Sequence, residues 1–480
     1  MTERFSFQSL LQSTRTVWVV GVFAFILFLA TDLPWQLDDY DQAKQAFTSF
    51  EIVKEGHWFY QRTPHEHVAT KPPLVAWISA GLFTITRSWD AAWRVPSLLS
   101  AVAISLLLFR HASSSYGTAA GLIAFSAFNF NLLTPRLATL VRTDMALTLA
   151  IFLIGLQIWQ KIRKREVWRF HDRLLIFVLL TAAMLIKGPI VYAFLLPGIA
   201  IFQWWARKNN APDAWCGWWP WMGSLAIFLF WAIGGCIFVP QFYEQVVLRE
   251  FVGRFGETVH RPQPIYFYLP HLLHKFAPWS VLLIGVGIVD LRARQWKIRE
   301  VLRNISPEVL WLICWSMGAL LVMSLIPSKR VDRIFPVIPP LCLLLAAQVA
   351  QHRVRTMRWA GVALLVSIFF TAGYAGFKIF TGYRDHRDAL VNFGQAVQQT
   401  TAANHWRYEI LNAPDEGLLL YAQKLHFTRP EQAVAEWNRG NLDALLVLGR
   451  EAPTMMRDLE NAVLSPGPSM PGGEYVLIRR

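Results

Sequence analysis

The strongest constraint on this chain is a succession of apolar runs, each long enough, or nearly long enough, to cross a bilayer. The runs begin near Val17, Trp93, Thr118, Met145, Leu174, Pro189, Trp218, Pro270, Pro307, Phe335 and Met357. A transmembrane helix needs about 20 mainly apolar residues. Only 16% of the 480 residues are charged, whereas a soluble domain has about 25%. The sequence therefore predicts a polytopic α-helical membrane protein.

A net charge of +14 could also indicate a nucleic-acid-binding protein. The lysines and arginines of this chain, however, lie in clusters between the apolar runs. That pattern is typical of the loops of polytopic membrane proteins. We therefore expect the lipid bilayer as a partner and no nucleic acid.

The first apolar run, Val17–Ala30, follows Arg4 and Arg15, so a cleaved signal peptide is one interpretation. No small-residue cleavage site follows, because the run ends in "TDLPWQ". We interpret the run as an uncleaved first transmembrane helix.

Membrane topology follows from the basic loops, since cytoplasmic loops are enriched in Lys and Arg. The richest are "KIRKREVWRFHDR" (161–173), "RK" (207–208), "RARQWKIREVLR" (292–303) and "HRVRTMR" (352–358). If 71–89 is counted as a full span from a cytoplasmic N-terminus, all of these loops fall outside. If it is a juxtamembrane helix, all of them fall inside. The sequence thus predicts about eleven spans in a plasma (inner) membrane and an extracytoplasmic C-terminus.

This topology gathers the unusual polar residues on the extracytoplasmic face and predicts a cleft there. The outward segments are 32–92, 134–144, 187–189, 241–268 and 327–333.

After residue 383 the composition becomes polar. A helix-like "DALVNFGQAVQQTTAAN" is followed by the strand-like "RYEILNA", "DALLVLG" and "EYVLIR". Such mixed patterns indicate a small α/β domain. We predict a transmembrane domain over 1–383, which includes the extracytoplasmic loop 32–92, and an extracytoplasmic α/β domain over 384–480.

Carboxylates stand out at two places near the predicted membrane surface. Asp38, Asp39 and Asp41 follow the first span, where a carboxylate can act as a general base, bind a metal or stay solvated. The helix-periodic "AFTSFEIV" after them suggests that the loop folds back over the membrane. Asp144 heads an apolar span and needs a partner or a cavity. A structural ion pair with Arg136 or Arg142 is the alternative.

Cations are the second group of candidates. Lys71 follows "HVAT" and precedes two prolines that fix an entry turn. It could bind a lipid phosphate or simply reach the headgroup layer. The other outward cations could contact headgroups or stabilise a phosphate leaving group. They are Lys187, Arg249, Arg254, His260, Arg261, Lys329, Arg330 and Arg333.

A family resemblance covers about residues 17–380. It is carried by "YDQAKQAFTSFEIVKEGHW", "ATKPPLVAWISA", "AAWRVPSLLSAV", "RLATLVRTDMALT", "KGP", "QPIYFYLPHLLHKFAPWS" and "SLIPSKRVDRIFPVIPPLCLL". In this order the motifs resemble those of polyprenyl-phosphate-dependent glycosyltransferases of GT-C fold. The similarity is greatest to the ArnT-like and protein mannosyltransferase-related (PMT) branch.

The resemblance implies roles for individual residues. The family's first acidic residue precedes a Gly-x-Trp at a fixed distance, which selects Asp41 when applied to "GHW". The family's second acidic residue falls on Asp144, and its phosphate-binding lysine falls on Lys71. Arg254 and Lys329 are the best matches for further phosphate ligands. The secondary candidates are Asp39, His260 and Arg330.

One position departs from the family pattern. Relatives often have an acidic residue immediately before the lysine of "KPP", and it can help bind a metal. Thr70 stands there in this chain, although His65, Glu66 and His67 are close by. No cofactor is evident, and a divalent metal cannot be assigned.

The resemblance implies transfer of a sugar from a polyprenyl-phosphate carrier to an acceptor at the outer face of the membrane. A single displacement would invert the anomeric centre, with Asp41 as base. A transporter or flippase of a lipid-linked sugar is the main alternative, although transporters usually show internal repeats. A non-enzymatic envelope scaffold is the third. The sugar and the acceptor, whether lipid, glycan or protein, stay open.

Overall fold

A computed structural model provides the three-dimensional description of the chain. The described residues are 14–32, 35–37, 40–209, 211–253, 262–293, 295–297, 305–351, 355–468, 470 and 473–480. Five of the candidate residues named above lie outside these ranges, namely Asp38, Asp39, Arg254, His260 and Arg261.

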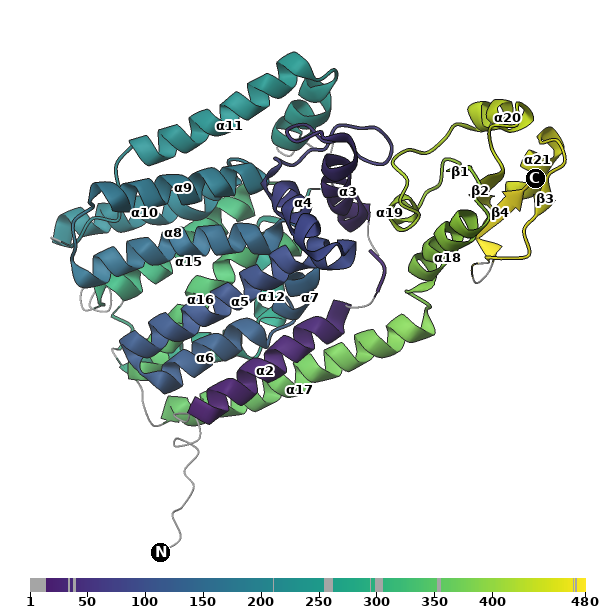
Figure 1. Ribbon diagram of the computed structural model, residues 1–480. Helices are drawn as coiled ribbons and strands as arrows, with labels where there is room; N and C mark the ends of the chain where they lie inside the picture. The colour runs from purple at the N-terminus through teal and green to yellow at the C-terminus, as the bar shows by residue number, and fades with distance from the viewer. Residues whose placement is uncertain are drawn as a thin grey trace, which may run out of the picture. The chain divides into compact units, whose positions relative to one another are not determined.

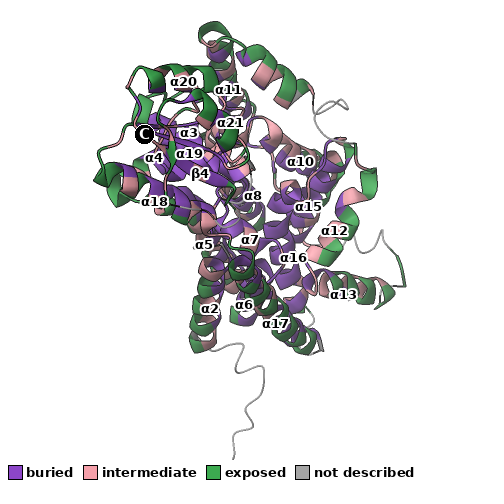
Figure 2. Ribbon diagram, turned by 90° about the vertical axis from the view of Figure 1, so that its right-hand side faces the viewer, coloured by how far each residue is buried: buried purple, intermediate pink, exposed green. Residues whose placement is uncertain are grey.

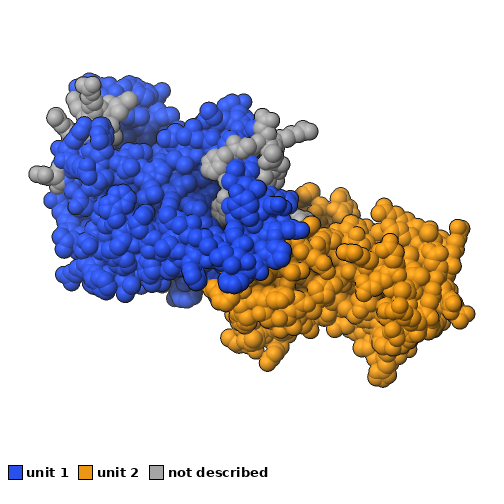
Figure 3. All heavy atoms as spheres, turned by 90° about the horizontal axis from the view of Figure 1, so that it is seen from above, with its two compact units in different colours: residues 1–31, 70–75, 94–376 blue, residues 32–69, 76–93, 377–480 orange. Residues whose placement is uncertain are grey.

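The chain forms two compact units, and both are discontinuous in sequence (Figure 3). Unit 1 consists of Met1–Thr31, Thr70–Val75 and Arg94–Gly376. Unit 2 consists of Asp32–Ala69, Ala76–Trp93 and Phe377–Arg480. Much of the first loop is thus grouped with the C-terminal part of the chain, while a domain boundary at residue 383 stays a prediction.

Unit 1 is helical, and three of its helices, α2, α5 and α17, have residues at one end that belong to unit 2. Its first helices are α2 (Thr14–Asp32), α5 (Trp89–Tyr116), α6 (Thr118–Asn129), α7 (Thr134–Thr139), α8 (Asp144–Lys164), α9 (Phe170–Lys187), α10 (Ile190–Asn209) and α11 (Trp219–Phe238). They are followed by η1 (Tyr243–Val252), η2 (Ile265–Phe267), α12 (Tyr268–Lys275), α13 (Trp279–Ala293), α15 (Pro307–Leu325), η3 (Val331–Val337), α16 (Ile338–Gln351) and α17 (Arg355–Arg384).

Seven helices among the described residues are long and apolar enough to cross a membrane. They are Trp89–Tyr116, Asp144–Lys164, Ile190–Asn209, Trp219–Phe238, Pro307–Leu325, Val331–Gln351 and Thr356–Arg384. The segments 265–275 and 279–293, bent by 103°, add an eighth if they form one broken span. The predicted polytopic helical fold is confirmed, and the count of eleven spans stays a prediction.

The spans of unit 1 differ in how much of each is buried. In the helix over Val331–Gln351, 83% of the most apolar stretch is buried, whereas in α11 the share is 28% (Figure 2). Apolar side chains of α11 such as Phe230 and Phe238 are exposed. In a bilayer such exposed apolar faces meet lipid. Helices α10 and α15 pack closely (Figure 1). A Cβ on Gly198 would lie 2.7 Å from the Cα of Trp315, so this glycine permits the close approach.

Helix α4 (Leu74–Thr86) tests the segment on which the topology depends. Its 13 residues extend only about 20 Å at 1.5 Å per residue. The hydrocarbon core is about 30 Å thick. The length of α4 therefore agrees with a juxtamembrane helix rather than a full span.

Unit 2 contains helices on the first loop and a small sheet. The helices are α3 (Tyr40–Glu55), α18 (Ala389–Ala403), α19 (Gly417–Tyr421), α20 (Pro430–Asn438) and α21 (Ala452–Asp458), together with most of α4. The strands are β1 (Tyr408–Ile410), β2 (Ala444–Leu448), β3 (Val463–Leu464) and β4 (Tyr475–Arg479). The sheet order is β1-β2-β4-β3, with β1 parallel to β2 and the other pairs antiparallel. The predicted small α/β fold is confirmed.

Hydrogen bonds within unit 2 connect the start of the first loop to the C-terminal part. The backbone N–H of Leu37 donates to the Tyr421 hydroxyl at 2.7 Å. The backbone N–H of Gln36 donates to the Arg387 carbonyl at 3.1 Å. Helix α19 also packs against α3. The C-terminal part is therefore built onto the loop that carries Asp41.

Candidate functional site

The "KGP" motif shapes one wall of the candidate site. Helix α9 ends at Lys187, and Gly188 has a positive φ of 74° that L-residues rarely adopt. Pro189 then precedes α10, since proline is tolerated at a helix start. The turn thus places the lysine at the carboxyl end of α9, where the helix dipole favours a cation.

Asp144 pairs with this lysine across the ends of two neighbouring helices. Lys187 Nζ donates a hydrogen bond to Asp144 Oδ1, and each side chain is 11% exposed. Asp144 lies in the first turn of α8, where the helix dipole favours an anion. Arg142, one of the two arginines that the sequence suggested as a structural partner, also pairs with Asp332 of η3 at 2.8 Å.

Lys71 has a partner that the sequence did not indicate. Its Nζ lies 3.2 Å from Glu250 Oε2, and the Lys71 side chain is 30% exposed. Glu250 belongs to η1, a π-helix. The ion pair joins the "KPP" motif to the outward segment 241–268.

These groups surround one cavity of about 270 Å³ within unit 1. Its lining contains the cations Lys71, Lys187 and Arg333 and the carboxylate of Glu250. The rest of the lining is small, hydroxylic or apolar and consists of Thr70, Pro72, Pro189, Ile190, Ala193, Val322, Met323, Ile326 and Ser328. Cationic groups and an apolar wall in one cavity suit a phosphate that carries a hydrocarbon chain.

The "PSKR" loop contributes Ser328 and Arg333 to this cavity. Nη1 of Arg333 donates a hydrogen bond to the Ser328 carbonyl at 2.6 Å, and this bond holds the guanidinium against the loop. Lys329 is buried, and its Nζ donates to the Gln263 carbonyl at 2.8 Å. Burial lowers the pKa of Lys329. Neither Lys329 nor the half-buried Arg330 lines the cavity, so their predicted roles as phosphate ligands stay predictions.

Asp41 lies in the first turn of α3 in unit 2 and is half-buried. Its place opposite the cavity cations stays a prediction that rests on the motif spacing. The structure does bring together the Asp144–Lys187 pair and Lys71, which the sequence had singled out separately.

A metal next to Lys71 does not fit the described residues of this cavity. Thr70 supplies no carboxylate, and Glu250 is paired with Lys71. Within the described part of the chain, a group of three donors suited to a metal occurs at Glu51, Glu55 and His57 of unit 2. We therefore derive no step through a metal.

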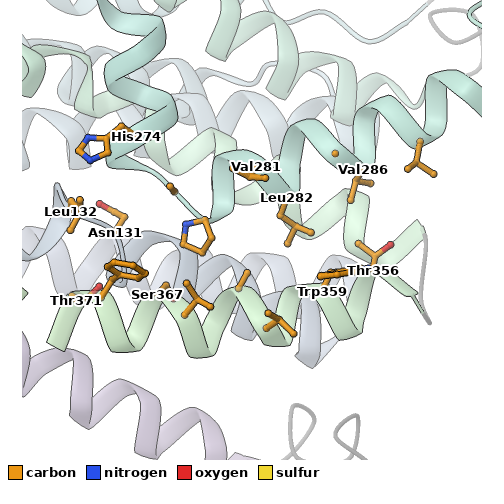
Figure 4. Close-up of a pocket in the computed structure, with 18 residues that line it drawn as sticks. Asn131, Leu132, His274, Val281, Leu282, Val286, Thr356, Trp359, Ser367 and Thr371 are labelled. Carbon is orange, nitrogen blue, oxygen red and sulfur yellow. The ribbon is translucent and has the colours of Figure 1, made fainter. Parts of the chain in front are cut away.

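A second cavity in unit 1, of about 1020 Å³, is almost wholly apolar. Figure 4 shows Val281, Leu282 and Val286 of α13 facing Trp359 and Ser367 of α17 across it. Its lining suits a hydrocarbon chain rather than a reaction.

Glu416 is a buried carboxyl in unit 2 that no sequence motif singles out. Its side chain is 2% exposed, and neither of its oxygens has a hydrogen-bond partner. His65 Nε2 lies 3.7 Å from Glu416 Oε1. Burial raises the pKa of Glu416 to about 7, with the positive charge of Lys44 opposing the rise and the negative charge of Asp41 adding to it.

This raised pKa predicts a pH-dependent stability. An unfolded glutamate has a pKa of about 4.3, so the folded protein must hold an unfavourable charge once the pH exceeds about 7. Stability from this group is therefore lost between about pH 4.5 and pH 7, by at most about 4 kcal/mol at 1.36 kcal/mol per pKa unit. We expect Glu416→Gln to abolish this dependence, raising the Tm relative to wild type at pH 8 but not at pH 4.5. Thermal unfolding of the full chain in detergent at both pH values measures it, and an equal difference at both would contradict the assignment.

Comparisons with known proteins agree with this fold. A family model described as "Dolichyl-phosphate-mannose-protein mannosyltransferase" matches residues 70–233. The chain is 24% identical over 335 residues to an undecaprenyl phosphate-alpha-4-amino-4-deoxy-L-arabinose arabinosyl transferase of Shewanella sediminis, covering 68% of this chain and 58% of that protein. It is 26% identical over 343 residues to the protein of Sodalis glossinidius that has the same name with the number 1, covering 68% of this chain and 57% of that one. The match thus spans less than two thirds of these relatives.

Solved structures extend the likeness to nearly the whole chain. The crystal structure of ArnT from Cupriavidus metallidurans bound to undecaprenyl phosphate has a TM-score of 0.70 at 15% identity, covering 97% of this chain and 98% of that one. The archaeal oligosaccharyltransferase AglB from Archaeoglobus fulgidus has a TM-score of 0.51 at 10% identity, covering 92% and 71%. The predicted resemblance is confirmed, since the chain is similar in sequence to ArnT-like and protein mannosyltransferase-related proteins and shares their GT-C fold.

Proposed function

We propose that this protein is a membrane glycosyltransferase that moves a sugar from a polyprenyl phosphate to an acceptor at the outer face of the membrane. The observation that carries the proposal is the cavity of unit 1, where Lys71, Lys187 and Arg333 lie beside an apolar wall. Similarity to arabinosyl transferases that use an undecaprenyl-phosphate donor supports it. The predicted topology supports the extracytoplasmic orientation.

The cations of the cavity have a defined task in this reaction. When the bond between the anomeric carbon and the phosphate oxygen breaks, the polyprenyl phosphate gains negative charge. Fixed cations in a water-poor cavity stabilise that charge more strongly than water would. Glu250 holds Lys71 until the phosphate arrives. Asp144 is a positioning residue in this scheme, because it contacts Lys187 rather than the cavity itself.

The nucleophile is a hydroxyl group of the acceptor. Its oxygen attacks the anomeric carbon opposite the phosphate, and its proton passes to the Asp41 carboxylate. A single displacement of this kind inverts the anomeric centre. Arg254, Lys329 and the secondary candidates Asp39, His260 and Arg330 remain proposed contributors through the family motifs. The sugar is of the class carried on polyprenyl phosphates, with 4-amino-4-deoxy-L-arabinose as the first one to test.

A transfer assay distinguishes the enzyme from a flippase. Membranes containing the protein receive a polyprenyl-phosphate donor with a radiolabelled sugar, and label is measured in the lipid carrier and in acceptor fractions. We expect label to leave the carrier only when the protein is present. Label that changes its side of the membrane but stays on the carrier would support the flippase and contradict the proposal.

Lys71→Met tests the phosphate-binding role. Removing a group that stabilises a developing oxyanion costs about 10²–10³-fold in rate, so we expect a fall in kcat/KM for the lipid donor of about that size. Lys164→Met is the matched control, because Lys164 is an exposed lysine at the end of α8 that is farther from Asp144. Equal activity of the two variants would contradict the role of Lys71.

A further inference from the structure

The carboxyl end of α3 brings three metal-ligand side chains to one point. The helix ends at Glu55, and Gly56 has a positive φ of 77°. Its backbone N–H donates to the Ile52 carbonyl at 3.0 Å, closing the last turn. The chain therefore reverses at Gly56 and returns His57 over the helix, where it meets Glu51.

The donor atoms have the separations that a small cation needs. His57 Nδ1 lies 2.9 Å from Glu51 Oε1 and 3.4 Å from Glu55 Oε2. All three donor atoms lie within 4.8 Å of one another. Zinc bonds of about 2.0–2.2 Å in tetrahedral geometry place their ligand atoms roughly 3.3–3.5 Å apart. The two distances from His57 thus come within a few tenths of an ångström of this spacing.

The other oxygen of each carboxylate has a donor outside the group. Glu51 Oε2 accepts a hydrogen bond from the backbone N–H of Arg62. Glu55 Oε1 lies 2.9 Å from Nε2 of His426, which the chain supplies from the segment between α19 and α20. Metal-binding carboxylates are usually oriented by outer hydrogen bonds of this kind. The remaining oxygens are thus turned toward His57.

The three side chains differ in exposure, so that one is fixed in the protein interior and the others can be reached by a cation from solvent. The Glu51 side chain is 2% exposed, whereas Glu55 is 25% and His57 48% exposed. Two carboxylates and a neutral imidazole would balance a divalent cation, and a nitrogen ligand selects a zinc-type metal over Ca²⁺ or Mg²⁺.

We propose that Glu51, Glu55 and His57 bind one zinc-type divalent cation, with His426 orienting Glu55. The cation would hold the end of α3 to the C-terminal part of unit 2 through the Glu55–His426 contact. The inference is independent of the proposed transfer reaction, and it does not use the residue that precedes Lys71 in the sequence. With no cation bound, His57 and Glu51 can form a hydrogen bond between Nδ1 and Oε1.

The experiment measures metal binding directly. The full-length protein is purified in detergent, stripped with a chelator and titrated with Zn²⁺ by calorimetry, and Co²⁺ absorption reports the ligand geometry. We expect one site in the wild type. His57→Ala should weaken zinc binding at least 100-fold, and His426→Ala by about 10–100-fold, as for outer partners of metal ligands.

His67→Ala is the matched control, because His67 is an exposed histidine of the same loop that lies outside the donor group. Its affinity should match that of the wild type. Zinc should also raise the Tm of the wild type and of His67→Ala above that of the same stripped protein, but it should leave the Tm of His57→Ala unchanged. The proposal would be overturned if the wild type had no zinc site, or if His57→Ala and His67→Ala bound zinc equally. The three side chains would then form a hydrogen-bonded cluster without a metal.

Discussion

Asp41→Asn is expected to lower kcat for sugar transfer by about 10²–10⁴-fold, the usual contribution of a general base. Asparagine keeps the shape of the side chain but cannot accept the hydroxyl proton of the acceptor. Donor binding should change little, because the proposed phosphate ligands are separate side chains. Single-turnover transfer from a labelled polyprenyl-phosphate sugar to acceptor separates the chemical step from binding.

Asp38→Asn provides the comparison for this experiment. It removes a neighbouring carboxylate of the same loop, but the motif spacing does not select it. We expect near-wild-type transfer from Asp38→Asn. Full activity of Asp41→Asn would refute the base assignment, and an equal loss in both variants would point to the charge of the loop as a whole.

The fold followed from features that are local in sequence. The apolar runs predicted helices because each residue in lipid must satisfy its backbone hydrogen bonds within its own helix. The basic loops decided that 71–89 is a juxtamembrane segment, and the 13 residues of α4 agree. The three longest strands were also visible as short apolar and β-branched segments bounded by polar residues.

The site was only partly predictable, because its partners come from distant parts of the chain. Lys71 was found through the "KPP" motif, but Glu250 is 179 residues away on a π-helix with several other charges. Nothing local distinguishes its carboxylate. The same applies to Asp144, whose partner was sought among nearby arginines but is the lysine at the end of α9.

Glu416 illustrates a further limit of sequence reasoning. It lies in an otherwise ordinary polar segment, and its burial results from the packing of α19 against α3. A carboxylate without hydrogen-bond partners is costly to bury, so such a group is not expected from composition. The division into units likewise depends on long-range contacts, since the first loop is grouped with residues 377–480.

The Asp144–Lys187 pair gives the largest expected effect on stability. Lys187→Met leaves a buried carboxylate without this cation, and breaking a buried ion pair by removing one partner costs about 3–5 kcal/mol. Lys208→Met, which removes an exposed lysine at the end of α10, should change stability little. Thermal unfolding in detergent compares the two variants.

A double variant then separates the positioning role of Asp144 from a catalytic one. Asp144→Asn with Lys187→Met should be more stable than Lys187→Met alone, because no unpaired carboxylate is left. If Asp144 acts through Lys187, Asp144→Asn should raise KM for the lipid donor more than it lowers kcat in the folded fraction. It should also add little to the loss of activity caused by Lys187→Met. A large fall in kcat with unchanged KM would instead support the catalytic role implied by the family motif, since that pattern marks an interaction made only in the transition state.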